Sequence, residues 1–125
     1  MSHITTVATE IRDREVLVQA LEQLGVAWAE NRWVHGHEGS IRMDILIGNE
    51  LRAGMGFGRA GPDLAYVVHS WGRGWGGNSS RRDRILQEYA RLKVLKEARR
   101  RNYGLVEQTR CSGNRIRLVL RKAAG

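Results

Sequence analysis

The hydrophobic and polar positions of this chain are most regular over residues 80–104, SRRDRILQEYARLKVLKEARRRNYG. At 100° per residue, apolar side chains sweep out one broad face of this segment, and charged side chains occupy the opposite side. The pattern predicts one long amphipathic helix, with Ser79 or Ser80 as its N-cap and Gly104 as its C′ residue. Asp83 in the first turn suits the helix dipole. The predicted apolar face is Ile85, Leu86, Tyr89, Ala90, Val94 and Ala98, and the predicted polar face is Arg84, Glu88, Arg91, Lys96 and Arg99.

A second, shorter helix is predicted from Arg14 to Leu24, where apolar residues recur with the spacing of one helix face. Asp13 is a suitable N-cap for it, and Gly25 is a suitable stop. A helix with a single apolar face must pack on something, most simply a sheet.

Alternating and apolar runs predict seven strands, bounded by glycine, asparagine and other turn residues. The second run is interrupted by Glu30 and Asn31, and residues 35–40 are predicted to form a turn. Short loops between the four central strands indicate an antiparallel meander. The predicted strands cover residues 2–11, 26–34, 41–47, 51–57, 64–71, 105–109 and 116–120.

The predicted element order is β-α-β-β-β-β-α-β-β, an α+β fold with a mainly antiparallel sheet and two helices packed on one face. The last strand alternates Ile116, Leu118 and Leu120 with arginines, which predicts one buried and one solvated face. No linker, repeat or low-complexity segment divides the chain, so residues 1–125 are predicted to form a single domain.

Composition narrows the class of protein. A hydrophobic content of 42% with mixed charge is typical of a soluble globular protein. No apolar run approaches the roughly 18 residues of a membrane helix, so no membrane insertion is expected. The opening residues, MSHITTVATEIRD, lack the pattern of a signal peptide, and a single cysteine, Cys111, excludes an internal disulfide. These features favour a reducing compartment, and the cytoplasm is the expected location.

The formal net charge is +8, and the long helix carries most of it. Residues 81–101 contain nine Arg or Lys against three Asp or Glu, a net charge of +6. A basic helix of this kind can contact phosphate backbones or acidic protein surfaces, or can simply present a solvated face. The candidates for nucleic-acid binding are Arg81, Arg82, Arg99, Arg100 and Arg101.

The segment before the long helix, here called the Trp71–Trp75 loop, contains two tryptophans, an arginine and several glycines. Such a loop can stack nucleic-acid bases beside the basic helix, or anchor a protein interface through its tryptophans. Alternatively, Trp71 packs over the core and the glycines allow a tight return into the helix. The candidates for partner binding are Trp71, Arg73 and Trp75, together with Arg84 and Arg91 on the helix.

Gly56, Gly58 and Gly61 match the letters of a dinucleotide-binding G-x-G-x-x-G motif. That motif needs a helix N-terminus directly after it, aimed at the pyrophosphate. Pro62, Asp63 and a strand follow instead, so the motif is rejected. The glycines are assigned to a β-bulge and a hairpin turn, and no cofactor is expected.

The histidines are weak candidates for a metal site. His35 and His37 are spaced to share one side of a strand, where His3, His69 or Cys111 could complete a ligand set. No further ligand follows at a metal-site spacing, and flanking glycines favour two solvated turn histidines. No metal is therefore expected.

Nucleophilic catalysis has no assembled set of residues in the sequence. Arg110 beside Cys111 can activate the thiol, but a lone cysteine is more often a packing residue. Ser70 and His69 are neighbours in a predicted strand, so their side chains point to opposite faces. No catalytic residue is predicted, and the protein is expected not to be an enzyme.

Five segments, which together span nearly the whole chain, carry a resemblance to a known family. They are MSHITTVATEIRD, ALEQLG (20–25), Met55-Gly-Phe57, Tyr66-Val-Val-His-Ser-Trp71-Gly72 and LQEYARLKVLKEARRRNYGLVEQ. The family that they resemble is catalogued as domain of unknown function 1257 and is also called the hypothetical chloroplast reading frame 35 family. This chain departs from the family pattern at Ser70, where relatives favour an acidic residue, and in being more basic.

The family occurs in cyanobacteria, plastids and other bacteria and has no established activity, so the resemblance supplies no site residues. Its association with genes for ATPases of the AAA type implies an accessory or adaptor role, with such an ATPase system as partner. The expected function is that of a non-enzymatic accessory protein that binds another protein through the Trp71–Trp75 loop and the 80–104 helix. The alternative is RNA or DNA binding through the basic helix.

Overall fold

The structure is a computed structural model, and it describes residues 5–36, 39–48, 54–71, 75–111 and 115–122. For residues 75–79 it describes the backbone alone. The predicted element order is confirmed. The elements are β1 (Thr5–Ala8), α1 (Arg14–Gln23), β2 (Trp28–Gly36), β3 (Gly39–Ile47), β4 (Gly54–Gly58), β5 (Val67–Trp71), α2 (Trp75–Arg100), β6 (Tyr103–Arg110) and β7 (Ile116–Lys122).

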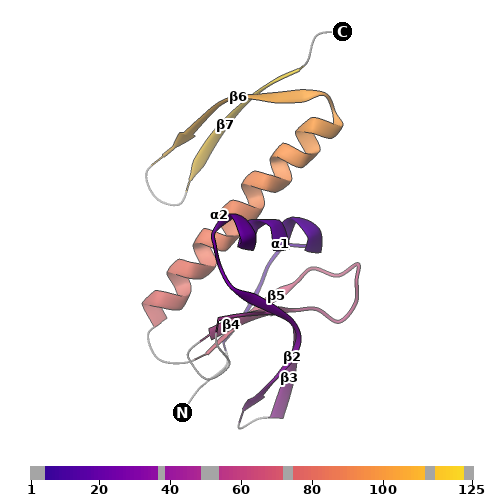
Figure 1. Cartoon of the computed structure of the whole chain (residues 1–125), viewed down its shortest axis with the longest axis vertical. Coiled ribbons are helices and arrows are strands. Elements are labelled where there is room, and N and C mark those ends of the chain that lie inside the picture. Colours follow the sequence, from indigo (N-terminus) through magenta and orange to yellow (C-terminus); the bar gives the residue numbers. More distant parts are fainter. Residues whose placement is uncertain (1–4, 37–38, 49–53, 72–74, 112–114, 123–125) are drawn as a thin grey trace.

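The first five strands form one antiparallel sheet in the order β1-β5-β4-β3-β2. Strands β2 to β5 follow one another as the predicted meander, and β1 pairs with β5 at the far edge. Strands β6 and β7 form a separate two-stranded sheet, here called the β6–β7 hairpin. Both helices lie on one face of the large sheet, and the hairpin lies beside the C-terminal half of α2, away from that sheet (Figure 1). The predicted α+β class is confirmed.

Helix α1 begins and ends as its sequence predicts. Asp13 is the N-cap, and its Oδ1 accepts a hydrogen bond of 3.2 Å from the Val16 amide. Gly25 follows the C-cap Leu24 with a φ of +67°, a left-handed conformation that glycine adopts without steric cost. The buried face of the helix is Val16, Leu17, Ala20 and Leu21.

One hydrophobic core joins α1, α2 and the large sheet. Cross-strand partners Ile45, Phe57 and Val68 lie side by side on the helix-facing surface of the sheet. Phe57 packs edge-on against Tyr66, with ring centroids 6.3 Å apart. The core residues are Ile11, Val16, Leu17, Ala20, Leu21, Ile45, Ile47, Met55, Phe57, Tyr66, Val68, Ile85, Tyr89 and Leu92.

The glycines of β4 serve close packing, and the predicted bulge is wrong. Residues 54–58 pair without a register shift along β5, and Gly56 lies opposite Leu46 of β3. A Cβ on Gly56 would lie 2.8 Å from Met43 Sδ and 3.1 Å from the Ile45 carbonyl oxygen. Glycine is therefore needed because the neighbouring strand leaves no room for a side chain.

The predicted ends of the long helix are wrong at both termini. Helix α2 begins at Trp75, so Ser79 and Ser80 lie inside it and Asp83 lies beyond its first turn. The backbone continues as helix through Gly76 and Gly77, despite the low helix propensity of glycine. The helix ends at Arg100, and Asn102, with a φ of +63°, takes the left-handed turn that was assigned to Gly104, which lies in β6.

Helix α2 buries two different sides, where the sequence predicted one. Its middle turns pack Ile85, Tyr89 and Leu92 into the main core. Ala98, on the opposite side, is also buried, while Val94 is 44% exposed and Ala90 is exposed. The predicted single face merged these two sides and omitted Leu92, because a helical wheel cannot show that a hairpin packs behind the last turns.

Glu88 was assigned to the solvated face of the helix, and this assignment is wrong. Glu88 is only 8% exposed, and it lies next to the side of α2 that packs into the main core. Arg91 Nε donates to Glu88 Oε1 at 2.9 Å, and Arg91 Nη2 contacts the same oxygen. The buried carboxylate is tolerated because this guanidinium compensates its lost hydration.

Candidate functional site

The β6–β7 hairpin is the part of the described structure with the least burial. Every residue of β6 is exposed, and the residues of β7 are half-buried at most. The predicted buried face of the last strand is therefore only half-buried, because α2 is the main element that packs on the hairpin. Arg91 links the two, since its Nη1 donates to Gln108 Oε1 of β6 at 3.3 Å.

A cavity of about 410 Å³ lies between the hairpin and the last turns of α2. This hairpin groove has an apolar floor, and its rim carries charged side chains. Tyr103 and Val94 are 39% and 44% exposed, and the neighbouring Leu105 and Val106 are 44% and 52% exposed. The groove is lined by Lys93, Val94, Glu97, Ala98, Arg101, Tyr103 and Leu120.

The charge of the molecule is concentrated on α2 and the hairpin. Residues 81–122 contain fourteen Arg or Lys against four Asp or Glu, a net charge of +10. Residues 1–80 contain seven against nine, a net charge of −2. The hairpin groove thus lies within the strongly positive part of the chain, where an acidic surface would be attracted.

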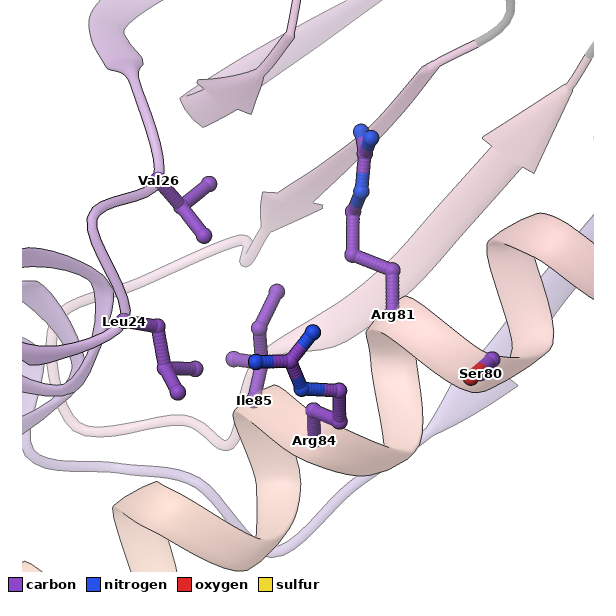
Figure 2. Close-up of a pocket in the computed structure, with 6 residues that line it drawn as sticks. All are labelled: Leu24, Val26, Ser80, Arg81, Arg84 and Ile85. Atoms are coloured by element: carbon purple, nitrogen blue, oxygen red, sulfur yellow. The ribbon is translucent and has the colours of Figure 1, made fainter.

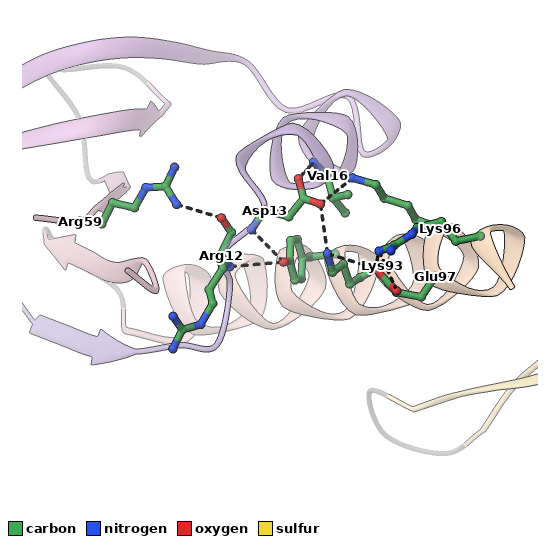
Figure 3. Close-up of polar contacts among 9 residues, drawn as sticks. Arg12, Asp13, Val16, Arg59, Lys93, Lys96 and Glu97 are labelled. Atoms are coloured by element: carbon green, nitrogen blue, oxygen red, sulfur yellow. Dashed lines mark hydrogen bonds and ion pairs between the residues drawn. The ribbon is translucent and has the colours of Figure 1, made fainter. Parts of the chain in front are cut away.

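A polar cluster on Asp13 fixes α2 against α1 (Figure 3). Asp13 Oδ2 accepts hydrogen bonds from Lys96 Nζ at 2.7 Å and from Lys93 Nζ at 3.1 Å. The backbone amides of Arg12 and Asp13 both donate to the Tyr89 hydroxyl, at 3.4 and 3.2 Å. These contacts position the helix whose far end carries the hairpin.

The protonation of Asp13 depends on this cluster. Burial raises the pKa of Asp13, but the hydrogen bonds from Lys96, the Val16 amide and Lys93 outweigh burial and lower the pKa to about 2. The hydrogen bond to Asp13 raises the pKa of Lys96. Asp13 and Lys96 therefore stay charged at neutral pH, and the cluster is a structural clamp.

Of the predicted loop residues, only Trp71 lies within the described part at side-chain level. Trp71 ends β5, is half-buried, and faces Gly54 of β4 across the ladder. Arg73 lies outside the described residues. Trp75 is the first residue of α2, and its side chain is outside the description.

The helix arginines fall into three groups. Arg81 and Arg84 are exposed and line a second cavity, beside Leu24 and Val26. Arg91 is occupied within the chain by Glu88 and Gln108. The other candidates are spread over the surface of the helix and its C-terminal end. Arg82 Nε lies 3.6 Å from Asp83 Oδ1, and Arg100 Nη1 lies 3.3 Å from Glu97 Oε1. Arg99 and Arg101 are exposed where the helix ends.

The two clusters of nucleic-acid candidates lie far apart. Arg82 and Arg100 are eighteen residues apart in one helix, a separation of about 27 Å along its axis. The structure therefore does not bring these arginines into a single patch. A polyanion that contacts both clusters must run along α2.

The residues considered for metal binding or catalysis lie on separate elements. His35 Nδ1 pairs with Ser40 Oγ at 2.6 Å in the β2–β3 hairpin, and His69 Nδ1 pairs with Thr6 Oγ1 at 2.9 Å in the large sheet. Burial lowers the pKa of His69. Cys111 is exposed after β6. The described part of the chain contains no cluster of three or more His, Cys, Asp or Glu, while His3 and His37 lie outside it.

The hairpin groove was missed in the sequence. Leu105 and Val106 are adjacent apolar residues of β6, and both are exposed where the pairing with β7 shifts register. That adjacency was the available signal. Its meaning depended on seeing that the hairpin stands apart from the large sheet.

Comparison with known proteins places the chain in a family. The family model described as "Protein of unknown function (DUF1257)" matches residues 20–119, most of the chain, and the protein belongs to this family. The chain is also similar to the uncharacterized protein ycf35 of Pyropia yezoensis, with 26% identity over 127 residues and 98% of each chain covered. No solved structure matches it. The family resemblance noted in the sequence is thereby confirmed.

Among the described residues, neither helix combines the length and the apolar character that a bilayer crossing requires.

Proposed function

We propose that this protein is a non-enzymatic accessory protein that binds another protein through the hairpin groove and the outer surface of the β6–β7 hairpin. The observation that carries the proposal is the exposure of Tyr103, Leu105 and Val106 on the hairpin, whose described residues are absent from the main core. Val94, on the neighbouring surface of α2, is exposed as well.

Physical chemistry supports an interface here. A two-stranded sheet is marginally stable in water unless another element covers its apolar face. In this chain α2 covers that face only in part, since Leu118 and Leu120 remain half-buried. A partner that covered the remaining apolar surface would stabilise the hairpin, because burial contributes about 25 cal/mol per Å².

The charges around the groove define the partner's chemistry. The hairpin carries five Arg or Lys against the single Glu107. Lys93 and Arg101 lie on the rim of the groove beside Glu97. The partner surface is therefore one with an apolar centre and an acidic border, because such a border would be attracted to this rim.

A pull-down from native extract tests the proposal, with the double variant Leu105→Ser, Val106→Ser as the probe. We expect it to lose the partner that the wild-type protein captures. The matched control is Trp33→Ser with Leu64→Ser, which removes two apolar side chains of 58% and 52% exposure from elsewhere on the surface. Equal capture by the wild type and the hairpin variant, or equal loss in both variants, would contradict the proposal.

A second contact with the partner is proposed for the Trp71–Trp75 loop, which adjoins the N-terminal end of α2, opposite to the end that carries the hairpin groove. A tryptophan at an interface commonly contributes more than its neighbours. Trp75→Ala in the same pull-down tests this part by itself, and unchanged capture would restrict the interface to the hairpin. An ATPase system of the AAA type, implied by the family resemblance, is the first partner to seek among the captured proteins.

A second candidate function, RNA or DNA binding along α2, is favoured by the charge of +10 on residues 81–122. Binding to a phosphate backbone weakens steeply as salt rises, with a slope set by the number of phosphates contacted. We expect Arg99, Arg100 and Arg101 changed to Gln to weaken binding to single-stranded RNA and to reduce that slope. Equal affinity of this triple variant and the wild type for RNA would exclude this candidate.

A further inference from the structure

We propose that a second cavity, between the end of α1 and the first half of α2, binds a small organic anion with an apolar body. This anion pocket has a volume of about 370 Å³. It lies toward the opposite end of α2 from the hairpin groove, so it is a separate site from the proposed protein interface. It is lined by Leu24, Val26, Ser80, Arg81, Arg84 and Ile85 (Figure 2).

One wall of the anion pocket is apolar. Leu24 and Val26 follow α1 as it ends, and both are half-buried against the main core. Ile85 of α2 is fully buried and closes the base between the two helices. Figure 2 shows Leu24 and Val26 on one side of this space and the side chains of α2 on the other. An aliphatic or aromatic body would lose its hydration against this wall.

The other wall carries two guanidinium groups on neighbouring turns of the helix. Arg81 and Arg84 are three residues apart, a spacing that places both on one side of α2. Like charges at this spacing destabilise a helix slightly. A carboxylate or phosphate between them would remove this repulsion and accept paired hydrogen bonds from a planar guanidinium fork.

These two arginines differ from most basic residues of α2, because no described acidic residue pairs with them. Within the described part of the chain, no ion pair involves Arg81 or Arg84, and none of the residues that line the pocket is acidic. The paired basic residues of the same helix are Arg82, Arg91, Lys93, Lys96 and Arg100. Two unpaired cations facing an apolar wall are the chemistry that selects an amphipathic anion.

The volume sets the size of the ligand. A water molecule accounts for about 30 Å³ of liquid, so the cavity holds roughly a dozen non-hydrogen atoms. Octanoate and phenyl phosphate are of this size, and each joins an anionic head to an apolar body. These two compounds are the probes for the test, with octanamide as the uncharged analogue of octanoate and inorganic phosphate as a head group without a body.

The test is a titration of the full chain with each probe, followed by amide chemical shifts and by calorimetry. We expect octanoate or phenyl phosphate to shift the amides of residues 24–26 and 80–85. Octanamide and inorganic phosphate should each bind at least tenfold more weakly, because octanamide lacks the anionic head and inorganic phosphate lacks the apolar body. Arg81→Gln with Arg84→Gln should weaken the anionic probe at least tenfold.

The matched control is Arg99→Gln with Arg101→Gln, which removes two charges at the C-terminal end of α2 that pair with no described acidic residue. We expect it to leave probe binding within twofold of the wild type. All four arginines are exposed, so neither double variant should disturb the fold. Absence of binding by both anionic probes at millimolar concentration, shifts confined to other residues, or equal weakening in the two double variants would overturn the proposal. Loss of the protein partner in a pull-down would not bear on it.

Discussion

Asp13 joins the two helices by acting on both at once. One of its carboxylate oxygens caps α1 and the other accepts from Lys93 and Lys96 of α2. Its pKa in the folded protein, about 2, lies below the ordinary value of 3.8. The ionised form therefore stabilises the folded state; this contribution is complete above about pH 4 and is lost as the pH falls toward 2.

We expect Asp13→Asn to remove this contribution and to keep the N-cap, because Asn caps helices as well as Asp does. Each unit of pKa corresponds to about 1.4 kcal/mol, and solvent around the lysines screens part of it, so the expected loss at pH 7 is about 1–2 kcal/mol. Urea unfolding at pH 7 and at pH 2–3 measures the difference, which should shrink as the pH falls. A difference of the same size at both pH values would contradict an ionic origin.

Gly56 shows why one position of β4 accepts only glycine. We expect Gly56→Ala to destabilise the protein by about 1–3 kcal/mol, because its Cβ would overlap the buried Met43 side chain. Gly104→Ala is the matched control, since a Cβ there would meet nothing within 4 Å and should change stability by less than about 0.5 kcal/mol. The midpoint of thermal unfolding compares the two variants, and an unchanged midpoint for Gly56→Ala would refute the packing explanation.

Tyr66 and Tyr89 place the same hydroxyl group in opposite situations. The Tyr66 hydroxyl is buried without a hydrogen-bond partner within the described structure, and burial raises its pKa. The Tyr89 hydroxyl accepts from two backbone amides at the start of α1. We expect Tyr66→Phe to leave the free energy of unfolding unchanged or slightly raised, and Tyr89→Phe to lower it by about 1 kcal/mol. Chemical denaturation of both variants measures this, and a larger loss for Tyr66→Phe would show that its hydroxyl has a partner.

At the scale of the elements, α2 packs against two separate structures, which lie on opposite sides of the helix. Its middle turns complete the core shared with α1 and the large sheet, and its last turns support the hairpin. None of the core residues comes from β6 or β7. The hairpin is therefore an appendage of the helix rather than a part of the core.

We expect a chain that ends at Asn102 to retain the fold of β1 to β5 and α1. Its core is complete without the hairpin, and the main losses are the Arg91–Gln108 bond and the cover over Ala98. Amide spectra of the shortened chain should overlay those of the full chain for residues 5–36 and 54–71. Collapse of that dispersion would show that the hairpin is needed for the core to form.

At the scale of the whole molecule, stability and charge are both divided unevenly. The sheet and α1 hold most of the buried apolar surface and a charge of −2, and α2 with the hairpin holds a charge of +10. Regions with few buried contacts open locally at low cost. The hairpin groove and the two arginines of the anion pocket lie in the positive part, whereas the negative part contributes the stable frame and the apolar wall of that pocket.

Hydrogen exchange measures this division directly. We expect the amides of β3, β4 and β5 to exchange only through global unfolding, and those of β6 and β7 to exchange at least a hundredfold faster, because the hairpin opens without breaking the core. Bound octanoate should slow the exchange of amides near Leu24 and should leave the exchange rates of the hairpin amides unchanged. Equal protection of the hairpin and the central strands would contradict this division.

The sequence predicted the elements and their order well, because local rules govern them. Asp13 and Gly25 marked the ends of α1 correctly, since capping and left-handed turns are decided within a few residues. The predicted ends of α2 were wrong because local capping rules alone do not decide where this helix begins and ends. Ser79 and Ser80 satisfy the local rule for a cap, but the helix continues past them to Trp75.

The sites were less predictable, because they depend on which surfaces meet. Arg84 was identified as a site residue, but its pairing with Arg81 across from Leu24 and Val26 required the contact between the two helices. Glu88 was assigned to the solvated side, but it is buried beside the main core, where Arg91 compensates its charge. The exposed Leu105 and Val106 had no meaning until the hairpin was seen to stand apart.

The sequence by itself determined the class of fold, the order of its strands and helices, the family and the excess of positive charge, since these follow from local periodicity, composition and residue identity. Only the tertiary structure decided where α2 divides between core and hairpin, which cations remain unpaired and where cavities open. Those properties arise from packing between segments far apart in the chain, and no local pattern encodes the distance between two surfaces.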